Sequence, residues 1–174
     1  MKWILIIAVI LLLPILVMLV AGLLQPVKHS VTRSIHLNQK PEVVFALLAD
    51  TTNLPSWSST VASVEPLSAR DGKPAVQCTL KWGRMQMIMT QSECAPPSRL
   101  VTIMSKPGGA VLGTWTYQIT PDAEGCRVAL TEEGELKNPF FQLMARMRGL
   151  DANITQTLRD LAKKYGESAP ATLN

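Results

Sequence analysis

Two charged residues occupy positions that share the spacing of buried apolar residues. Arg33 lies in a segment that alternates apolar and polar residues, and Glu132 lies in a second such segment. Because an isolated charge is costly to bury, we expect the two to meet as an ion pair. The pair is either structural or a clamp for the polar head of a ligand, and Glu132 is also a candidate acid or base. No second base or nucleophile accompanies them, so we predict no catalytic residues.

The sequence lacks the usual signatures of metal and nucleotide sites. It contains no Cys-x-x-Cys and no His-Glu-x-x-His, and a zinc site needs three or four convergent ligands. The two histidines are His29 and His36, and His36 has the outward spacing of its segment. Gly108 and Gly113 have the spacing of a phosphate-binding loop, but Thr114 stands where the loop requires lysine. We therefore predict neither a metal nor a cofactor.

Alternate positions of several segments carry methionine or aromatic side chains that share one face. Methionine adapts to irregular apolar shapes, whereas Trp and Tyr add polar groups that need partners when buried. These side chains either line a pocket for an apolar ligand or fill a core. The predicted lining comprises Arg33, Cys78, Leu80, Met85, Met87, Met89, Met104, Trp115, Tyr117, Glu132, Met144 and Met147.

The elements that position these residues follow from periodicity and turn residues. A short helix is expected from Pro41 and a helical turn at residues 54–57. One long amphipathic helix is expected over residues 139–165, with a kink at Gly149. Short connections imply antiparallel strands, and the long helix is the expected cover of the sheet, which gives an α+β fold. Seven strands are expected, at residues 31–37, 61–67, 75–82, 85–94, 99–104, 111–120 and 126–133.

Three stretches of the chain resemble the START-like, or SRPBCC, superfamily. They are residues 31–37 with 41–45 and 54–57, residues 113–119, and residues 127–134 with 138–141. The last two are similar to a membrane-anchored subgroup labelled polyketide cyclase/dehydrase, although Gln142 stands where that subgroup commonly has a basic residue. The resemblance covers residues 29–166 and implies a helix-grip fold, in which a curved sheet wraps a long C-terminal helix. It implies little about function, because the superfamily includes lipid carriers, hormone receptors and cyclases.

The N-terminal segment predicts a membrane anchor. Residues 3–24 contain no charge, and as a helix they would extend about 33 Å, enough to cross a hydrocarbon core. A cleaved signal sequence is the alternative, but the apolar run exceeds the usual length of one. We expect an anchor at residues 1–25, a tether at 26–30, the folded domain at 31–166 and a loose tail at 167–174. The short Met-Lys start resembles an export signal, which favours a single-pass protein of a bacterial plasma membrane with the domain outside the cytoplasm.

The charge balance excludes a nucleic-acid-binding protein. The net charge is +4 at neutral pH, and no run of lysine or arginine marks a basic face. The hypothesis is therefore a membrane-tethered module that holds a lipid or another hydrophobic small molecule between sheet and helix. The bilayer would be its partner through residues 3–24, and the sequence leaves the question of a protein partner open. The alternatives are a cyclase or dehydratase acting on an apolar substrate, and a protein-interaction domain with a filled core. We favour binding over catalysis.

Overall fold

The computed structural model describes residues 2–3, 13, 17, 20, 26–83, 85–136 and 138–168. The side chains of Phe140 and Phe141 are not among the parts it describes. The chain divides into two compact units. One unit combines Met1–His29 with Glu135–Leu150, and the other combines Ser30–Gly134 with Asp151–Asn174. Each unit is described by itself below.

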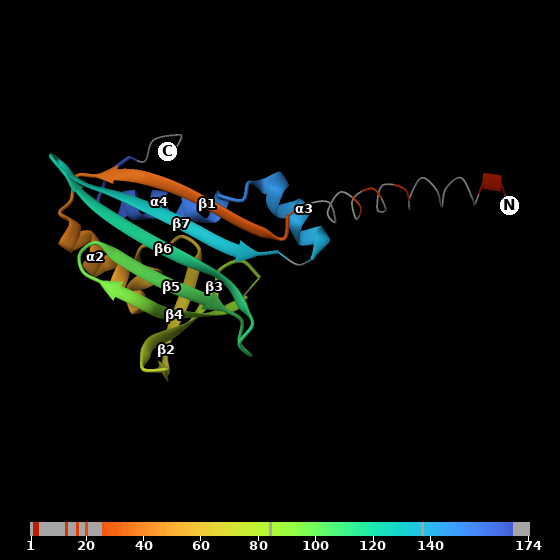
Figure 1. Cartoon of the computed structure of the whole chain (residues 1–174), viewed down its shortest axis with the longest axis horizontal. Helices are drawn as coiled ribbons and strands as arrows, with labels where there is room; N and C mark the ends of the chain where they lie inside the picture. The colour runs from red at the N-terminus through yellow and green to blue at the C-terminus, as the bar shows by residue number, and fades with distance from the viewer. Residues whose placement is uncertain are drawn as a thin grey trace. The chain divides into compact units, whose positions relative to one another are not determined.

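A seven-stranded antiparallel sheet forms the framework of the larger unit (Figure 1). The order across the sheet is β1-β7-β6-β5-β4-β3-β2, so the first and last strands are neighbours, as the helix-grip prediction requires. Each predicted strand is present, with ends shifted by a few residues. The strands are β1 (Lys28–Leu37), β2 (Val61–Arg70), β3 (Lys73–Leu80), β4 (Gln86–Ala95), β5 (Arg99–Ser105), β6 (Val111–Asp122) and β7 (Gly125–Glu135).

The strand directions place three segments at one end of the sheet. β1 runs antiparallel to β7, because the Thr32 hydroxyl meets that of Thr131 at 2.8 Å and Leu37, the last residue of β1, lies against Gly125, the first residue of β7. The β5–β6 and β3–β4 turns therefore lie at the end where β1 begins (Figure 1). The β6–β7 turn lies at the opposite end.

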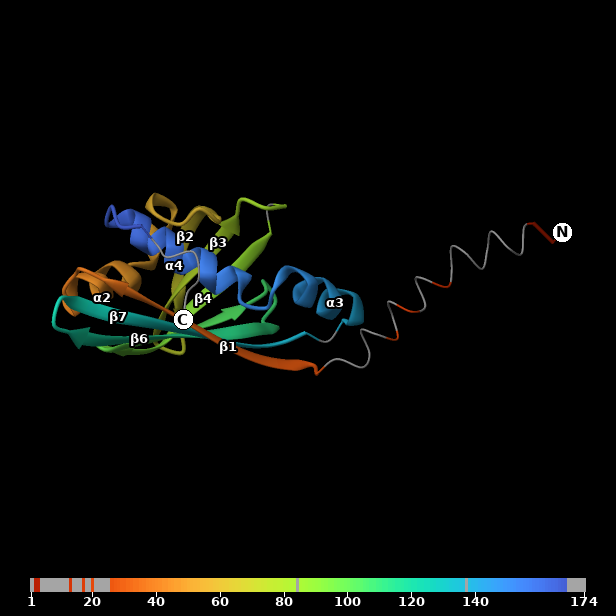
Figure 2. The same cartoon turned by 90° about the horizontal axis from the view of Figure 1, so that it is seen from above.

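Two helices cover the inner face of this sheet. They are α2 (Pro41–Ala49) and α4 (Ala152–Lys164), which lie on the same side of it (Figure 2). A short 3-10 helix, η1 (Thr51–Ser56), follows α2. The apolar stripe of α4 consists of Ile154, Leu158 and Leu161, all fully buried. Their spacing repeats every three to four residues, so one face of the helix packs on the sheet.

The single long C-terminal helix of the prediction is instead two helices. α3 (Pro139–Arg148) belongs to the smaller unit, and α4 belongs to the larger one. Gly149 separates them with a φ of +95°. Glycine adopts this left-handed region without the steric cost that other residues carry, and such a residue ends a helix rather than bending it.

The predicted membrane span at residues 3–24 falls almost entirely outside the described residues, and so does most of the predicted tail. Within the part of the chain that is described, no helix has both the length and the apolar character to cross a bilayer.

Candidate functional site

The inner face of the sheet is predominantly apolar. Its buried members come from all seven strands and pack into one core with α2, η1 and α4. Several apolar residues at the edge of this core remain partly exposed, among them Leu80, Met87, Leu112 and Trp115. The sheet residues that pack against α4 are therefore buried, whereas those at the edge of the core remain partly open to solvent.

A row of polar side chains crosses this apolar face. Gln91 of β4 pairs with Thr102 of β5, Thr102 pairs with Trp115 of β6, and Trp115 pairs with Glu132 of β7. Residues paired directly across antiparallel strands point to the same face. The row therefore places an amide, a hydroxyl, an indole N–H and a carboxylate side by side, and we refer to these four residues as the polar row.

Trp115 is the aromatic residue of the polar row. Its ring is half-buried and meets that of Tyr117 edge to face, with centroids 6.4 Å apart and planes at 78°. The indole Nε1 is buried and has no hydrogen-bond partner among the described residues. An unsatisfied buried donor costs free energy, so an acceptor on a bound molecule would stabilise it.

Three further polar side chains of this face are Tyr117, Gln91 and Thr102. Burial raises the pKa of the Tyr117 hydroxyl far above its usual range, so Tyr117 stays a protonated donor at physiological pH. The Gln91 side chain donates from Nε2 to the carbonyl oxygen of Ala49 at 2.5 Å, which joins β4 to the end of α2. Thr102 is almost fully buried, at 1% exposed.

Arg33 forms an ion pair with a partner that the prediction did not name. Its Nε donates to Oδ2 of Asp151 at 2.8 Å, whereas the expected partner was Glu132. Asp151 is the residue before α4, so the pair joins the start of α4 to β1. The two side chains are 38% and 30% exposed, and a pair this accessible stabilises the fold by less than about 1 kcal/mol.

The other predicted lining residues divide into three groups. Cys78, Met89, Met104 and Tyr117 are buried in the core. Leu80, Met87, Trp115 and Glu132 are half-buried on the inner face. Met85, Met144 and Met147 differ from the prediction, because they are 56%, 45% and 74% exposed.

The exposure of these three methionines has a local cause. Met85 precedes the first residue of β4, so the alternation of that strand does not extend to it. Met144 and Met147 lie on α3, which is separate from α4. The prediction missed Gln91 and Thr102. Alternation along β4 and β5 places Gln91 on the face of Met89 and Thr102 on the face of Met104, whereas their adjacency depends on cross-strand register.

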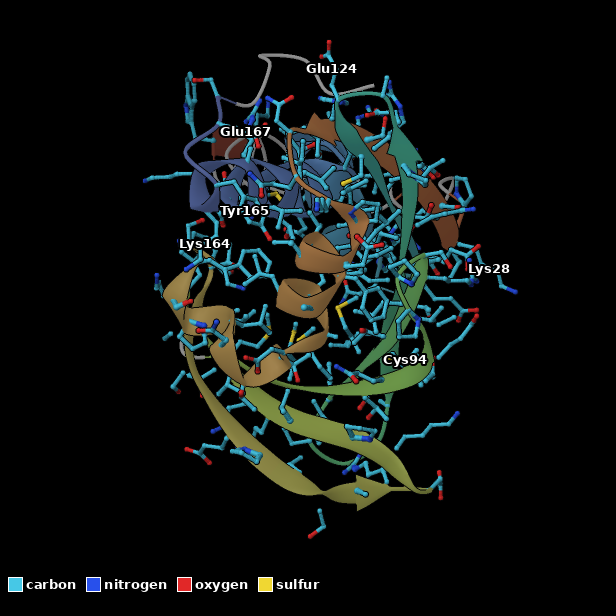
Figure 3. All side chains as sticks on the ribbon, turned by 90° about the vertical axis from the view of Figure 1, so that its left-hand side faces the viewer. Lys28, Cys94, Glu124, Lys164, Tyr165 and Glu167 are labelled. Carbon is cyan, nitrogen blue, oxygen red and sulfur yellow. The ribbon has the colours of Figure 1, made fainter. Side chains whose placement is uncertain are left out.

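The three cysteines differ in their accessibility to reagents. Cys78 and Cys126 are fully buried, and burial raises the pKa of each thiol to about 11. For Cys126, nearby carboxylates such as that of Asp122 add to the effect. Cys94 is exposed, near the end of β4 (Figure 3).

Only Cys94 should therefore react quickly with a thiol reagent in the folded chain. At pH 8 a group with a pKa near 11 is about one-thousandth thiolate, and the thiolate is the reactive form. We expect one fast equivalent of dithionitrobenzoate in buffer and three in urea, measured by absorbance. In the Cys94→Ser variant the fast equivalent should disappear. A second fast equivalent from the folded parent would contradict the burial of the other two thiols.

One hollow of the larger unit is polar. It has a volume of about 490 Å³ and is lined by Pro55, Ser56, Trp57, Ser58, Ser59, Lys81, Asp160, Lys163 and Lys164. Lys164, one of these lining residues, is labelled in Figure 3. Its hydroxyl and ammonium groups do not suit an apolar molecule. Among the described residues, no group of three or more His, Cys, Asp or Glu side chains could hold a metal ion.

Comparisons with solved structures show the same fold at low sequence identity. The Zhui aromatase/cyclase from Streptomyces sp. R1128 is 13% identical over 80% of this chain and 94% of its own, with a TM-score of 0.63. A START superfamily protein from Mycobacterium smegmatis is 14% identical over 78% and 96%, with a TM-score of 0.61. The di-domain ARO/CYC StfQ of the steffimycin pathway has a TM-score of 0.64 at 13% identity over 80% of this chain, which spans 52% of StfQ.

The family follows from the sequence comparison. No curated protein is similar enough in sequence to match. The family model described as polyketide cyclase / dehydrase and lipid transport matches residues 28–166, which include the whole sheet and α4. The chain therefore belongs to this family, within the START-like superfamily.

Proposed function

We propose that the chain is a membrane-tethered module that binds a hydrophobic small molecule, such as a lipid, against the inner face of its sheet. The observation that carries this proposal is the polar row on an otherwise apolar face, with an indole donor beside the carboxylate of Glu132. Binding sites for small molecules typically combine a predominantly apolar lining with a few polar groups that fix orientation.

The apolar part of the site would accept ligands of varied shape. Met87, Met89 and Met104 lie close together, since Met89 pairs with Met104 and Met87 is two residues from Met89 on the same face of β4. Unbranched thioether side chains rearrange at little cost, so such a surface suits a flexible acyl or isoprenoid chain. The polar row would then hold the polar end of the ligand.

The tether is the second part of the proposal and rests on the sequence. An uncharged run at residues 3–24 would keep the domain at the bilayer, where apolar ligands are concentrated. The family description, which includes lipid transport, is consistent with this role.

A cyclase or dehydratase is the second candidate. The observation that favours it is Glu132, a carboxylate on the inner face beside Trp115 and in position to act as an acid or base. The Zhui protein named above is an aromatase/cyclase with the same fold. An exposed apolar patch around Trp57 would favour the interaction-domain alternative, but Trp57 is only 9% exposed.

Native mass spectrometry of the full chain in nanodiscs tests the binding proposal. We expect a reproducible extra mass of a lipid or another apolar molecule. Glu132→Gln should reduce the bound fraction about tenfold, because hydrogen bonds to a charged group contribute more than those to a neutral one. Glu133→Gln is the matched control, since Glu133 is the next residue of β7 and is exposed. An unliganded mass after soaking with mixed lipids would rule the binding function out.

A further inference from the structure

The larger unit exposes large apolar side chains at two neighbouring turns. Trp82 is 86% exposed and Met85 is 56% exposed, both in the β3–β4 turn. Val111 is 65% exposed, at the point where the β5–β6 turn enters β6. A single exposed apolar residue is ordinary. Several on adjacent turns form an apolar patch, and such patches are typical of surfaces that bind a protein, a membrane or a ligand.

Strand register brings the two turns to one end of the sheet. Thr79 pairs with Gln86 just before the β3–β4 turn, and Ser105 pairs with both Ile88 and Val111. The two turns therefore project beyond adjacent strands, at the end where β1 begins (Figure 1). We call the described residues 81–83, 85 and 106–111 the turn surface.

The charge of the turn surface is entirely positive. Lys81 and Lys106 are exposed and lie next to the apolar residues. The sequence has no aspartate or glutamate at residues 79–92 or 102–121. Lys81 also donates from Nζ to the carbonyl oxygen of Ser58 at 3.5 Å and lines the polar hollow together with Asp160. A tryptophan flanked by basic residues is the composition that proteins place at the boundary between lipid headgroups and hydrocarbon.

The start of the chain brings the same end of the sheet to a membrane. The uncharged run ends at Leu24 and Ser30 already belongs to β1, so the intervening residues extend no more than about 20 Å. If residues 3–24 span a bilayer, the end of the sheet at which β1 begins is held next to it. This step rests on the tether of the proposed function.

We propose that the turn surface docks on the lipid bilayer, with Trp82 inserted at the interface and Lys81 and Lys106 near anionic headgroups. Docking would fix the orientation of the sheet, whereas the tether alone would only limit its distance from the membrane. Trp82 thus has a binding role separate from the inner face, where Glu132 and Trp115 would hold the ligand.

Quenching by brominated lipids in the full chain tests this contact. The chain would be reconstituted in vesicles of phosphatidylcholine and phosphatidylglycerol, in a Trp3→Phe background that removes the tryptophan of the apolar run. The emission of Trp82 is the difference between this chain and the same chain with Trp82→Phe. We expect brominated acyl chains to reduce the Trp82 emission at least twofold. Aqueous iodide should quench this emission less in the vesicle-bound chain than in the chain unfolded in urea.

The matched control carries a tryptophan at the other end of the sheet. Glu124 lies in the β6–β7 turn and is exposed (Figure 3), so Glu124→Trp in the chain lacking Trp82 should be open to iodide and unaffected by brominated lipid. Since Trp82 is 86% exposed, Trp82→Phe should leave the urea midpoint of unfolding unchanged. An unchanged midpoint shows that the variant is folded.

Two results would overturn the docking surface. One is that Trp82 is fully accessible to iodide and is not quenched by brominated lipid, while the chain stays with the vesicles after an alkaline wash. The other is quenching equal to that of the Glu124→Trp control. Loss of the whole chain in the alkaline wash would instead refute the tether, and loss of ligand mass with normal Trp82 quenching would refute only the binding function.

Discussion

Alanine at position 125 should destabilise the fold by roughly 3 kcal/mol or more, because backbone occupies the space that its side chain needs. A Cβ at Gly125 would lie 2.1 Å from the carbonyl oxygen of Leu37 and 2.9 Å from Cα of Asn38. Both atoms belong to the main chain at the end of β1, so no side-chain rotation relieves the clash. Urea unfolding followed by circular dichroism would measure the loss, or show that Gly125→Ala does not fold.

Glu124→Ala is the control for this prediction. Glu124 is the preceding residue of the same turn and is exposed, so its replacement should change the free energy of unfolding by less than about 0.5 kcal/mol. If Gly125→Ala unfolded at the urea concentration of the parent, the close approach of β1 to the β6–β7 turn would be disproved.

Removal of the Asp160 carboxylate should have the next largest effect. Asp160 is 5% exposed and lies on α4. Its Oδ2 accepts hydrogen bonds from the backbone N–H of Ser59 at 2.6 Å and from the Ser59 hydroxyl at 2.7 Å, and its Oδ1 accepts one from Gln156 at 2.9 Å. Asp160→Ala leaves these donors without an acceptor, which should cost roughly 3 kcal/mol in urea unfolding.

Two variants define what the Asp160 result means. Asp160→Asn keeps the shape but presents an N–H₂ group to one set of donors, so we expect an intermediate loss. Glu93→Gln removes one charge of the exposed pair with Arg99, which is 3.1 Å long, and should cost less than about 1 kcal/mol. Equal losses for Asp160→Ala and Glu93→Gln would show that the buried carboxylate contributes nothing special.

The strands were predictable because their signals are local. Alternating side chains and turn residues such as Pro107 and Gly108 depend only on a few neighbouring positions. The break at Gly149 was less accessible, because glycine in a helical pattern is compatible both with a kink and with an end. Its φ of +95° shows that a helix ends there. The apolar residues of the single predicted helix are therefore divided between α3 and α4.

The candidate site was only partly predictable, because it depends on register between strands. Alternation correctly indicated that Trp115, Tyr117 and Glu132 share a face. It did not indicate that Gln91 and Thr102 continue the row, since that requires the pairing of β4 with β5 and the irregularity between Gln91 and Glu93. The partner of Arg33 was missed for a similar reason, because Asp151 lies beyond the strands in a loop.

The attachments of α4 to the rest of its unit are unequal at its two ends. Near its C-terminal end, Asp160 is buried and binds Ser59, just before β2, through two hydrogen bonds, of 2.6 and 2.7 Å. At its N-terminal end, Asp151 contributes a solvent-accessible ion pair with Arg33. Of these two attachments the ion pair at Asp151 is the weaker, so we expect the start of α4 to open at a lower free energy than the segment around Asp160. A molecule that enters or leaves between helix and sheet would do so at that end, without unfolding of the domain.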